Sequence, residues 1–150
     1  MEEKVIIKIV PEGENKNIKL PVKMSPGASG FDLSAAIKEK IKILPGQRKL
    51  ISTGIRIEIP RGYEGQIRPR SGLAWEHGVT ILNSPGTIDS DYRGTLKIIL
   101  INLGEEPFEI SPGDRIAQLV IQKVPEVEFV KQGELSDSLR GHKGFGHTGR

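Results

Sequence analysis

Short apolar runs separated by turn signals recur along the chain. In one run Ile55, Ile57 and Ile59 alternate with Arg56 and Glu58, the period-two pattern of a strand with one buried face. The clearest runs cover residues 5–10, 41–44, 55–59, 95–101 and 116–121, and turn signals rich in proline and glycine lie at 26–27, 45–46, 60–62, 85–86 and 112–113. Many short strands with turns at this spacing predict an all-β sandwich or barrel.

Three segments depart from simple alternation. Residues 95–101 are almost continuously apolar, which predicts burial on both faces, at the centre of the molecule or of an assembly. The best helical segment is residues 71–77, with Ser71 placed to act as its N-cap. From residue 132 the chain is polar and glycine-rich, so we expect a β domain over 1–131 and a flexible arm over 132–150. The arm is either a frayed tail or a lid that orders on a ligand, and Phe145 between two glycines favours the lid.

Composition narrows the class of protein. With 150 residues the chain is long enough for one domain with an apolar core. It has no cysteine, which excludes disulfides and thiolate zinc sites and fits a reducing cytoplasm. A net charge of +3 with 5% aromatic residues is not typical of a nucleic-acid-binding protein. No apolar run approaches the length of a membrane span, so we expect no membrane partner.

Two carboxylates stand close together in residues 83–94. If this segment is a β-hairpin, Asp89 and Asp91 share a face, because side chains at i and i+2 point the same way. Paired carboxylates hold a metal or activate water. The alternative is a solvated turn, where aspartate and glycine are common for conformational reasons alone.

Basic and polar side chains flank the predicted helix. Arg68 and Arg70 lie just before it and Ser71 at its start, and such an arrangement either binds phosphate or is a capped helix with solvent-facing arginines. Downstream, Asp114 and Arg115 are expected to pair with each other at a turn.

Gln118 lies among apolar neighbours, so its amide either bonds to backbone or meets a ligand. His142 and His147 have no third ligand nearby, which argues against a metal site in the arm.

Together these segments resemble the trimeric dUTP pyrophosphatase family. The resemblance extends over residues 25–149 and rests on five ordered blocks: SGFDLSAA, RPRSGLA, NSPGTIDSDYRG, PGDRIAQLVI and RGHKGFGHTG. It implies a distorted jelly roll or β-barrel of the β-clip kind, with one short helix and a flexible C-terminal arm. It also implies a homotrimer with shared active sites and Mg²⁺-dependent hydrolysis of dUTP to dUMP and pyrophosphate. Such an enzyme keeps uracil out of DNA and supplies dUMP for dTMP synthesis.

The resemblance also implies residue roles. Asp89 would orient the water that attacks the α-phosphate, and Asp32 would touch the hydrated metal. Asn83 and main-chain groups near Lys97 would read uracil, while Tyr92 would pack under the deoxyribose. The complete set of implied substrate contacts is Arg70, Ser71, Gly72, Asn83, Gly86, Thr87, Ile88, Asp89, Tyr92, Lys97, Gln118, Arg140, Phe145 and Gly146.

Two arm positions differ from the usual family pattern. Lys143 stands where glycine is usual, and His147 where serine is usual. The histidine predicts activity that is sensitive to pH near neutrality, because imidazole changes charge in that range.

Two other functions compete with this prediction. A dCTP deaminase of the same fold, alone or combined with dUTP hydrolysis, would need a glutamate in the strand TLKIILIN, which has none. A non-catalytic nucleotide-binding trimer would be expected to lack the carboxylate or the arm, and both are present.

Overall fold

The computed structural model describes residues 3–13 and 18–149. Residues 1–2 and 14–17 of the expected β domain, and residue 150 of the expected arm, lie outside the described residues. The described elements are β1 (Lys8–Pro11), β2 (Phe31–Ser34), β3 (Ile41–Ile43), β4 (Arg48–Glu58), β5 (Tyr63–Arg68), α1 (Ser71–His77), β6 (Val79–Ile81), β7 (Gly86–Ile88), β8 (Thr95–Asn102), β9 (Phe108–Ile110) and β10 (Arg115–Lys123).

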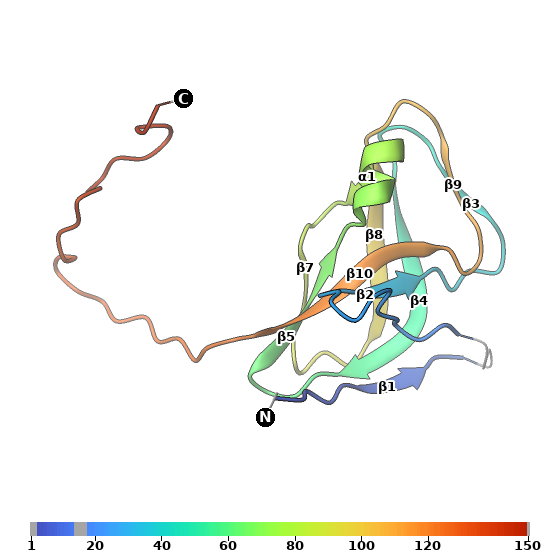
Figure 1. Cartoon of the computed structure of the whole chain (residues 1–150), viewed down its shortest axis with the longest axis horizontal. Helices are drawn as coiled ribbons and strands as arrows, with labels where there is room; N and C mark the ends of the chain where they lie inside the picture. The colour runs from blue at the N-terminus through green and yellow to red at the C-terminus, as the bar shows by residue number, and fades with distance from the viewer. Residues whose placement is uncertain (1–2, 14–17, 150) are drawn as a thin grey trace.

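Two antiparallel sheets and a ribbon make up the body (Figure 1). The first sheet has the strand order β1-β4-β8-β6, and the second has β2-β10-β5-β7. Strands β3 and β9 pair as a separate ribbon. Non-consecutive strands lie side by side throughout, so the predicted all-β class and distorted jelly roll are confirmed.

Isoleucine and leucine side chains from both sheets and the ribbon fill the core. The predicted alternation is confirmed in and just after β4, where Ile55, Ile57 and Ile59 are buried and Arg56 is exposed. The other buried members of the core are Leu33, Ala35, Ile43, Ile51, Ile67, Val79, Ile81, Leu96, Ile98, Leu100, Ile110, Ile116, Ala117 and Leu119. Burial of these side chains is the main stabilising contribution to the fold.

The apolar strand β8 is buried on one face only within this chain. Leu96, Ile98 and Leu100 are buried, whereas Ile99 and Ile101 on the other face are half-buried. The prediction of burial on both faces is therefore wrong for the single chain. Its alternative, burial within an assembly, stays a prediction.

The helix α1 has the predicted bounds but not the predicted cap. Arg70 occupies the N-cap position with an extended backbone, and no side chain caps the helix. Ser71 is the first helical residue, so the prediction that it is the N-cap is wrong. The helix ends at Gly78, which has a left-handed backbone and donates to the carbonyl groups of Ala74 and Leu73.

Residues 83–94 do not form a β-hairpin. Strand β7 pairs with β5 in the second sheet, and β8 pairs with β4 and β6 in the first. The segment therefore crosses from one sheet to the other. This corrects the expected hairpin, in which β7 and β8 would have paired with each other.

The chain beyond β10 extends away from the body (Figure 1). It carries exposed apolar side chains, among them Phe129, Leu139 and Phe145, and no residue between 124 and 149 is buried. Within the described residues, no helix is long and apolar enough to cross a membrane.

Candidate active site

Asp32 and two arginines form a compact cluster at one end of the second sheet, here called the arginine cluster. One Asp32 carboxylate oxygen lies 3.5 Å from Arg70 Nε, and the other lies 3.3 Å from an Arg115 terminal nitrogen. Arg70 also donates to the main-chain carbonyl of Arg115 at 3.1 Å. The Asp32 side chain is only 13% exposed, which strengthens these contacts because water screens them less. Two positive charges on one negative charge leave the cluster net positive and suited to an anion.

Gln118 adjoins the arginine cluster from the middle of the sheet. It pairs in register with Asp32 on β2 and with Arg68 on β5, so the three side chains share one face. Its amide donates to the Pro69 carbonyl at 2.9 Å, the backbone bond that the sequence allowed. A Cβ on Gly30 would lie 2.1 Å from the Gln118 amide oxygen, so only glycine leaves room for this orientation.

Sequence reasoning missed Arg115 as a member of this cluster. Asp114 accepts from the Ser111 main-chain N–H at 2.8 Å instead of pairing with Arg115. The predicted Asp114–Arg115 pair is therefore wrong. A register shift lies between Arg115 and Ala117, and the irregularity directs Arg115 towards Asp32. A shift of this kind is not visible in the alternation of residue types.

Asp89 lies in a tight turn directly after β7. Tyr92 donates its main-chain N–H to the Asp89 carbonyl at 3.1 Å, which closes residues 89–92, here called the Asp89 turn. Asp89 and Asp91 are exposed, and both line a cleft of about 440 Å³. The two carboxylates thus face one space, although a turn and not a strand brings them together. Residues 124–126, where the C-terminal segment begins, form another wall of this cleft.

The residues implied in base and sugar binding flank the Asp89 turn. Tyr92 donates its hydroxyl to the Thr95 carbonyl at 3.0 Å. A Cβ on Gly94 would lie 2.4 Å from that hydroxyl, so the ring packs directly on the Gly94 backbone. The remaining implied residues lie on the path from β6 to β8: Asn83 and Thr87 are exposed, Gly86 is buried, Ile88 is half-buried and Lys97 is exposed.

A polar contact from the N-terminal segment reaches Tyr63, which lines the Asp89 cleft. Lys123 and Tyr63 both bond to the Glu3 carboxylate, and these bonds lower the pKa of Glu3. In return, Glu3 raises the pKa of the Tyr63 phenol and of the Lys123 ammonium group.

The arginine cluster and the Asp89 turn lie at opposite ends of β5. Ile88 pairs with Gly65, so Asp89 lies level with Glu64 at the start of the strand. Arg70 follows the other end of the strand. The six residue steps from 64 to 70 correspond to about 20 Å of extended chain. Within one chain the backbones at Asp89 and Arg70 are thus well separated along this strand.

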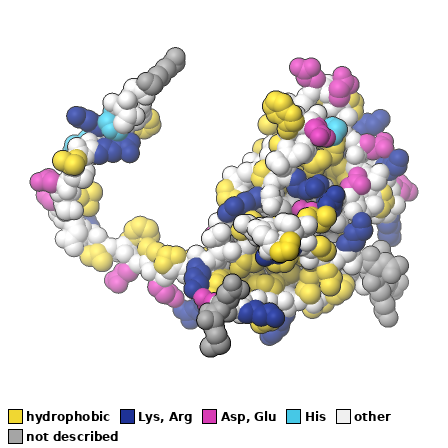
Figure 2. Space-filling view, viewed as in Figure 1, with side chains coloured by type: hydrophobic (Ala, Val, Ile, Leu, Met, Phe, Trp, Pro, Cys, Tyr) yellow, Lys and Arg dark blue, Asp and Glu magenta, His cyan; other side chains and the backbone are white. Residues whose placement is uncertain are grey.

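The arm residues lie away from both groups (Figures 1 and 2). Arg140 donates through Nε to the Lys143 carbonyl at 2.7 Å in a local turn, and the Phe145 ring is fully exposed. Gly146 follows it with φ of 87°. His147 is exposed in the same segment.

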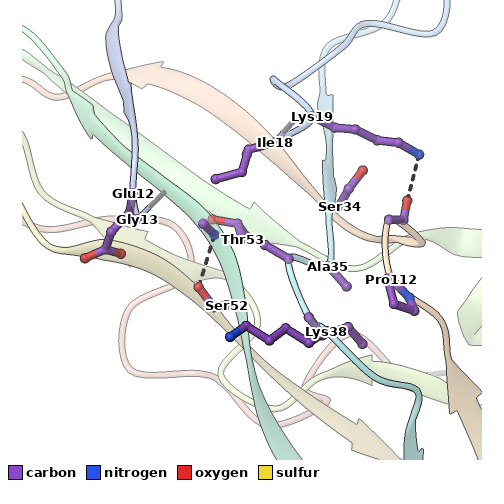
Figure 3. Close-up of a pocket in the computed structure, with 14 residues that line it drawn as sticks. Glu12, Gly13, Ile18, Lys19, Ser34, Ala35, Lys38, Ser52, Thr53 and Pro112 are labelled. Atoms are coloured by element: carbon purple, nitrogen blue, oxygen red, sulfur yellow. Dashed lines mark hydrogen bonds between the residues drawn. The ribbon is translucent and has the colours of Figure 1, made fainter. Parts of the chain in front are cut away.

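A second cleft, of about 730 Å³, contains none of the predicted site residues (Figure 3). It lies where the pairing of β4 and β8 shifts register, beside Thr53 and Gly54. Lys19 on its rim donates to the Gly113 carbonyl at 3.0 Å, and the Gly54 N–H donates to Ser52 Oγ at 3.1 Å. These two bonds lie within the cleft, and no residue to which the sequence-based prediction gives a role lines it.

No protein site for a fully chelated metal is present within residues 3–13 and 18–149. In that part of the chain no three histidine, aspartate or glutamate side chains group closely enough to hold an ion. Asp32 is the carboxylate nearest to the predicted phosphate-binding residues, and it is bonded to arginines. This donor set fits an ion that is held mainly by substrate phosphates and water, as Mg²⁺ usually is.

The fold and these two groups define a class: an all-β jelly-roll protein with a cluster of two arginines on a carboxylate and a separate carboxylate turn. A family model described as dUTPase matches residues 16–149, and the chain belongs to this dUTPase family. The predicted family resemblance is confirmed.

Relatives with curated names agree. The deoxyuridine 5'-triphosphate nucleotidohydrolase of Chlamydia pneumoniae is 60% identical over 132 residues, which are 87% of this chain and 91% of the relative. The protein of the same name from Caldanaerobacter subterraneus subsp. tengcongensis is 52% identical over 145 residues, covering 97% and 98% of the two chains.

Solved structures agree on the fold. A mutant dUTPase of Staphylococcus bacteriophage 80alpha with dUpNHpp has a TM-score of 0.87 and 27% identity, over 97% of this chain and 99% of that one. A mutant dUTPase of phage phi11 of S. aureus, described with a structural Mg(II) ion, has a TM-score of 0.78 and 23% identity, over 88% and 99%.

Proposed function

We propose that this chain is a dUTP diphosphatase, which hydrolyses dUTP to dUMP and pyrophosphate. The observation that carries the proposal is the combination, on a dUTPase fold, of a preformed arginine cluster with an exposed carboxylate in the Asp89 turn. The arginine cluster supplies positive charge that can bind a triphosphate. The Asp89 carboxylate supplies a base that takes a proton from water. Relatives at 52% and 60% identity carry the name of this activity.

Asp89 is the proposed general base. Its exposed carboxylate accepts a proton from a water molecule, whose oxygen attacks the α-phosphorus. The bond from the α-phosphorus to the bridging oxygen breaks, and pyrophosphate leaves. The protein forms no covalent bond to the substrate in this step. The rate enhancement therefore comes mainly from orienting the water and neutralising the phosphate charge.

Arg70, Ser71, Gly72 and Gln118 are the proposed phosphate contacts. The Asp32 carboxylate holds Arg70 in place before substrate arrives, which reduces the reorganisation needed on binding. The N–H groups of the first turn of a helix have no partner inside that helix, so those of Ser71 and Gly72 are free to donate.

Asn83 and main-chain groups of Gly86, Thr87, Ile88 and Lys97 are proposed to read uracil. A pocket that matches hydrogen bonds discriminates more strongly than one that only matches apolar shape.

The Tyr92 ring, held against Gly94, is proposed to pack under the deoxyribose. In that position it leaves no room for a 2′-hydroxyl, so UTP is excluded.

The arm is proposed to close over the substrate. Phe145 stacks on uracil, and Arg140 and Gly146 contact the phosphates. An exposed aromatic ring on an arm with no buried contacts supports this role, because such a segment gains order only when it covers a ligand. Closure excludes water from the site after the substrate has bound.

Mg²⁺ is the proposed cofactor, with Asp32 contacting its bound water. The ion neutralises phosphate charge when it is bound with the substrate. A structural Mg(II) ion is described for the phage phi11 relative, and the donor set around Asp32 fits an ion carried largely by phosphates.

A homotrimer with active sites shared between chains is the proposed assembly. The separation of about 20 Å between Asp89 and Arg70 along β5 supports it, since a second chain is needed to complete each site. Leu50, which pairs with Ile99 on the outer face of the first sheet, is 60% exposed, as expected of a surface that another chain covers. We further propose a cytoplasmic enzyme that keeps uracil out of DNA and supplies dUMP.

Pyrophosphate release from dUTP with Mg²⁺ tests the proposal, with dCTP, dTTP and UTP alongside. Asp89→Asn is expected to lower kcat by roughly 10²- to 10⁴-fold, because the general base is lost. Asp91→Asn in the same cleft is the matched control, with an expected loss below about tenfold. Release of ammonia from dCTP would identify a deaminase, and no turnover of any nucleotide would identify a binding protein.

A further inference from the structure

The helix α1 presents its tryptophan to solvent. Leu73 packs against the core and His77 contacts Phe108 with ring centroids 5.0 Å apart, so these two residues mark the inward side of the helix. At 3.6 residues per turn, Trp75 points away from them. Its side chain is 91% exposed in the single chain. Figure 1 shows α1 at the end of the body that carries the β3–β9 ribbon.

Exposure of one apolar residue does not by itself identify an interface. The position of Ser71 supplies the second observation. Ser71 and Trp75 are four residues apart, so they lie on the same side of the helix. A surface that approaches Ser71 from outside therefore also approaches Trp75.

The incomplete site indicates what approaches Ser71. The chain's own Asp89 turn lies about 20 Å from Arg70 along β5, and in the proposed shared site a phosphate held by Arg70 and Ser71 meets the Asp89 carboxylate of another copy. That copy must come against the outer side of α1. Tryptophan is among the residues most enriched where such contacts are energetically important.

We infer that Trp75 packs against a second copy of this chain, beside that copy's Asp89 turn, and is an anchor of the subunit interface. This inference rests on the shared site of the proposed function. It adds a residue outside the predicted substrate-binding set that couples assembly to completion of the site.

Acrylamide quenching of fluorescence tests this directly, because Trp75 is the only tryptophan in the chain. Sedimentation on the same sample reports whether the protein is assembled. In the assembled protein we expect a blue-shifted emission and a quenching constant several-fold below that of N-acetyltryptophanamide. An intact assembly in which Trp75 is quenched as readily as that free standard would overturn the inference, and so would a monomer.

Substitution provides an independent test. Trp75→Ala is expected to raise the protein concentration of half-dissociation at least about tenfold. Glu76→Ala, an exposed neighbour on the same helix, is the matched control and should leave it unchanged. If dilution does not dissociate the assembly, the urea concentration at which half of it dissociates is measured instead. We expect Trp75→Ala, and not Glu76→Ala, to lower that urea concentration relative to the unsubstituted protein. Equal behaviour of the two variants would contradict the inference.

The two proposals fail in different ways. Absence of dUTP hydrolysis by an assembled protein with a shielded Trp75 removes the proposed function and leaves the interface. Hydrolysis by an assembled protein with an exposed Trp75 removes only the interface.

Discussion

The arginine cluster holds its charged groups in contact with one another, whereas the Asp89 turn leaves its carboxylates facing solvent. Asp32 is 13% exposed and touches two guanidinium groups, and neighbouring Gln118 is fixed by a backbone bond. Asp89 and Asp91 lie on an open cleft, and Tyr92 is 43% exposed. The charged groups of the arginine cluster are thus held in place by contacts within one chain, whereas the two carboxylates of the Asp89 turn are open to solvent.

Breaking the arginine cluster should produce a larger effect than a change in the arm, at Gly30 or at Glu3. Arg70→Ala removes a phosphate contact and leaves the Asp32 carboxylate with one arginine, so we expect kcat/KM for dUTP to fall by roughly 10²-fold or more. Arg61→Ala is the control, because Arg61 makes only an exposed ion pair with Glu126. Initial rates of pyrophosphate release measure both. Equal losses would show that general charge, and not the cluster, binds the triphosphate.

Removing the arm should affect activity but not folding. A chain ending at residue 131 loses Arg140 and Phe145, so kcat/KM is expected to fall by about tenfold or more. The removed residues bury nothing in the body, so the Tm from a thermal melt should stay within a few degrees of the full chain. A large drop in Tm would mean that the arm stabilises the assembly itself.

A smaller change tests whether the fixed orientation of Gln118 contributes to binding of dUTP. Gly30→Ala places a methyl group against the Gln118 amide, which must then move. We expect KM for dUTP to rise by a few-fold, with a loss of stability of about 1–3 kcal/mol from overpacking. Gly27→Ala is a suitable control, since nothing lies within 4 Å of a Cβ built there. An unchanged KM would mean that the orientation of Gln118 is not used.

The smallest effect is expected at Glu3, which bonds to the cleft residue Tyr63. Glu3 has a lowered pKa, so its stabilising contribution is present above its unfolded pKa and is lost as pH falls through the folded value. Glu3→Gln should therefore lower Tm slightly at neutral pH, by no more than a few degrees, and the difference from wild type should vanish in acid. Thermal melts across pH measure this, and a difference that grows in acid would contradict it.

The sequence correctly predicted features that depend on residues close together in the chain. It missed features that depend on contacts between residues far apart in the chain. The alternation of Ile55, Ile57 and Ile59, and the extent of α1, follow from residue periodicity and are confirmed. The prediction that Ser71 is the N-cap of α1 was wrong, because Arg70 occupies the N-cap position without a side-chain hydrogen bond.

The errors around residues 83–94 and 114–118 have a common cause. Residues 83–94 read as a hairpin, but the choice of pairing partner for β7 is set by β5, which is distant in sequence. Arg115 reaches Asp32 where the register of β10 with β2 shifts, and no residue pattern signals such a shift. The residue roles and the shared site that the family resemblance implies stay predictions, and the block that contains Arg115 gave no sign that this residue contacts Asp32.

Complementation between two inactive variants tests the shared site most directly. Arg70→Ala and Asp89→Asn are each prepared alone, then mixed one to one under conditions that exchange subunits, and pyrophosphate release from dUTP is measured. If each site takes Arg70 from one chain and Asp89 from another, random mixing restores about a quarter of wild-type activity. A mixture no more active than the two variants measured separately would contradict the account, because each chain would then build its own site.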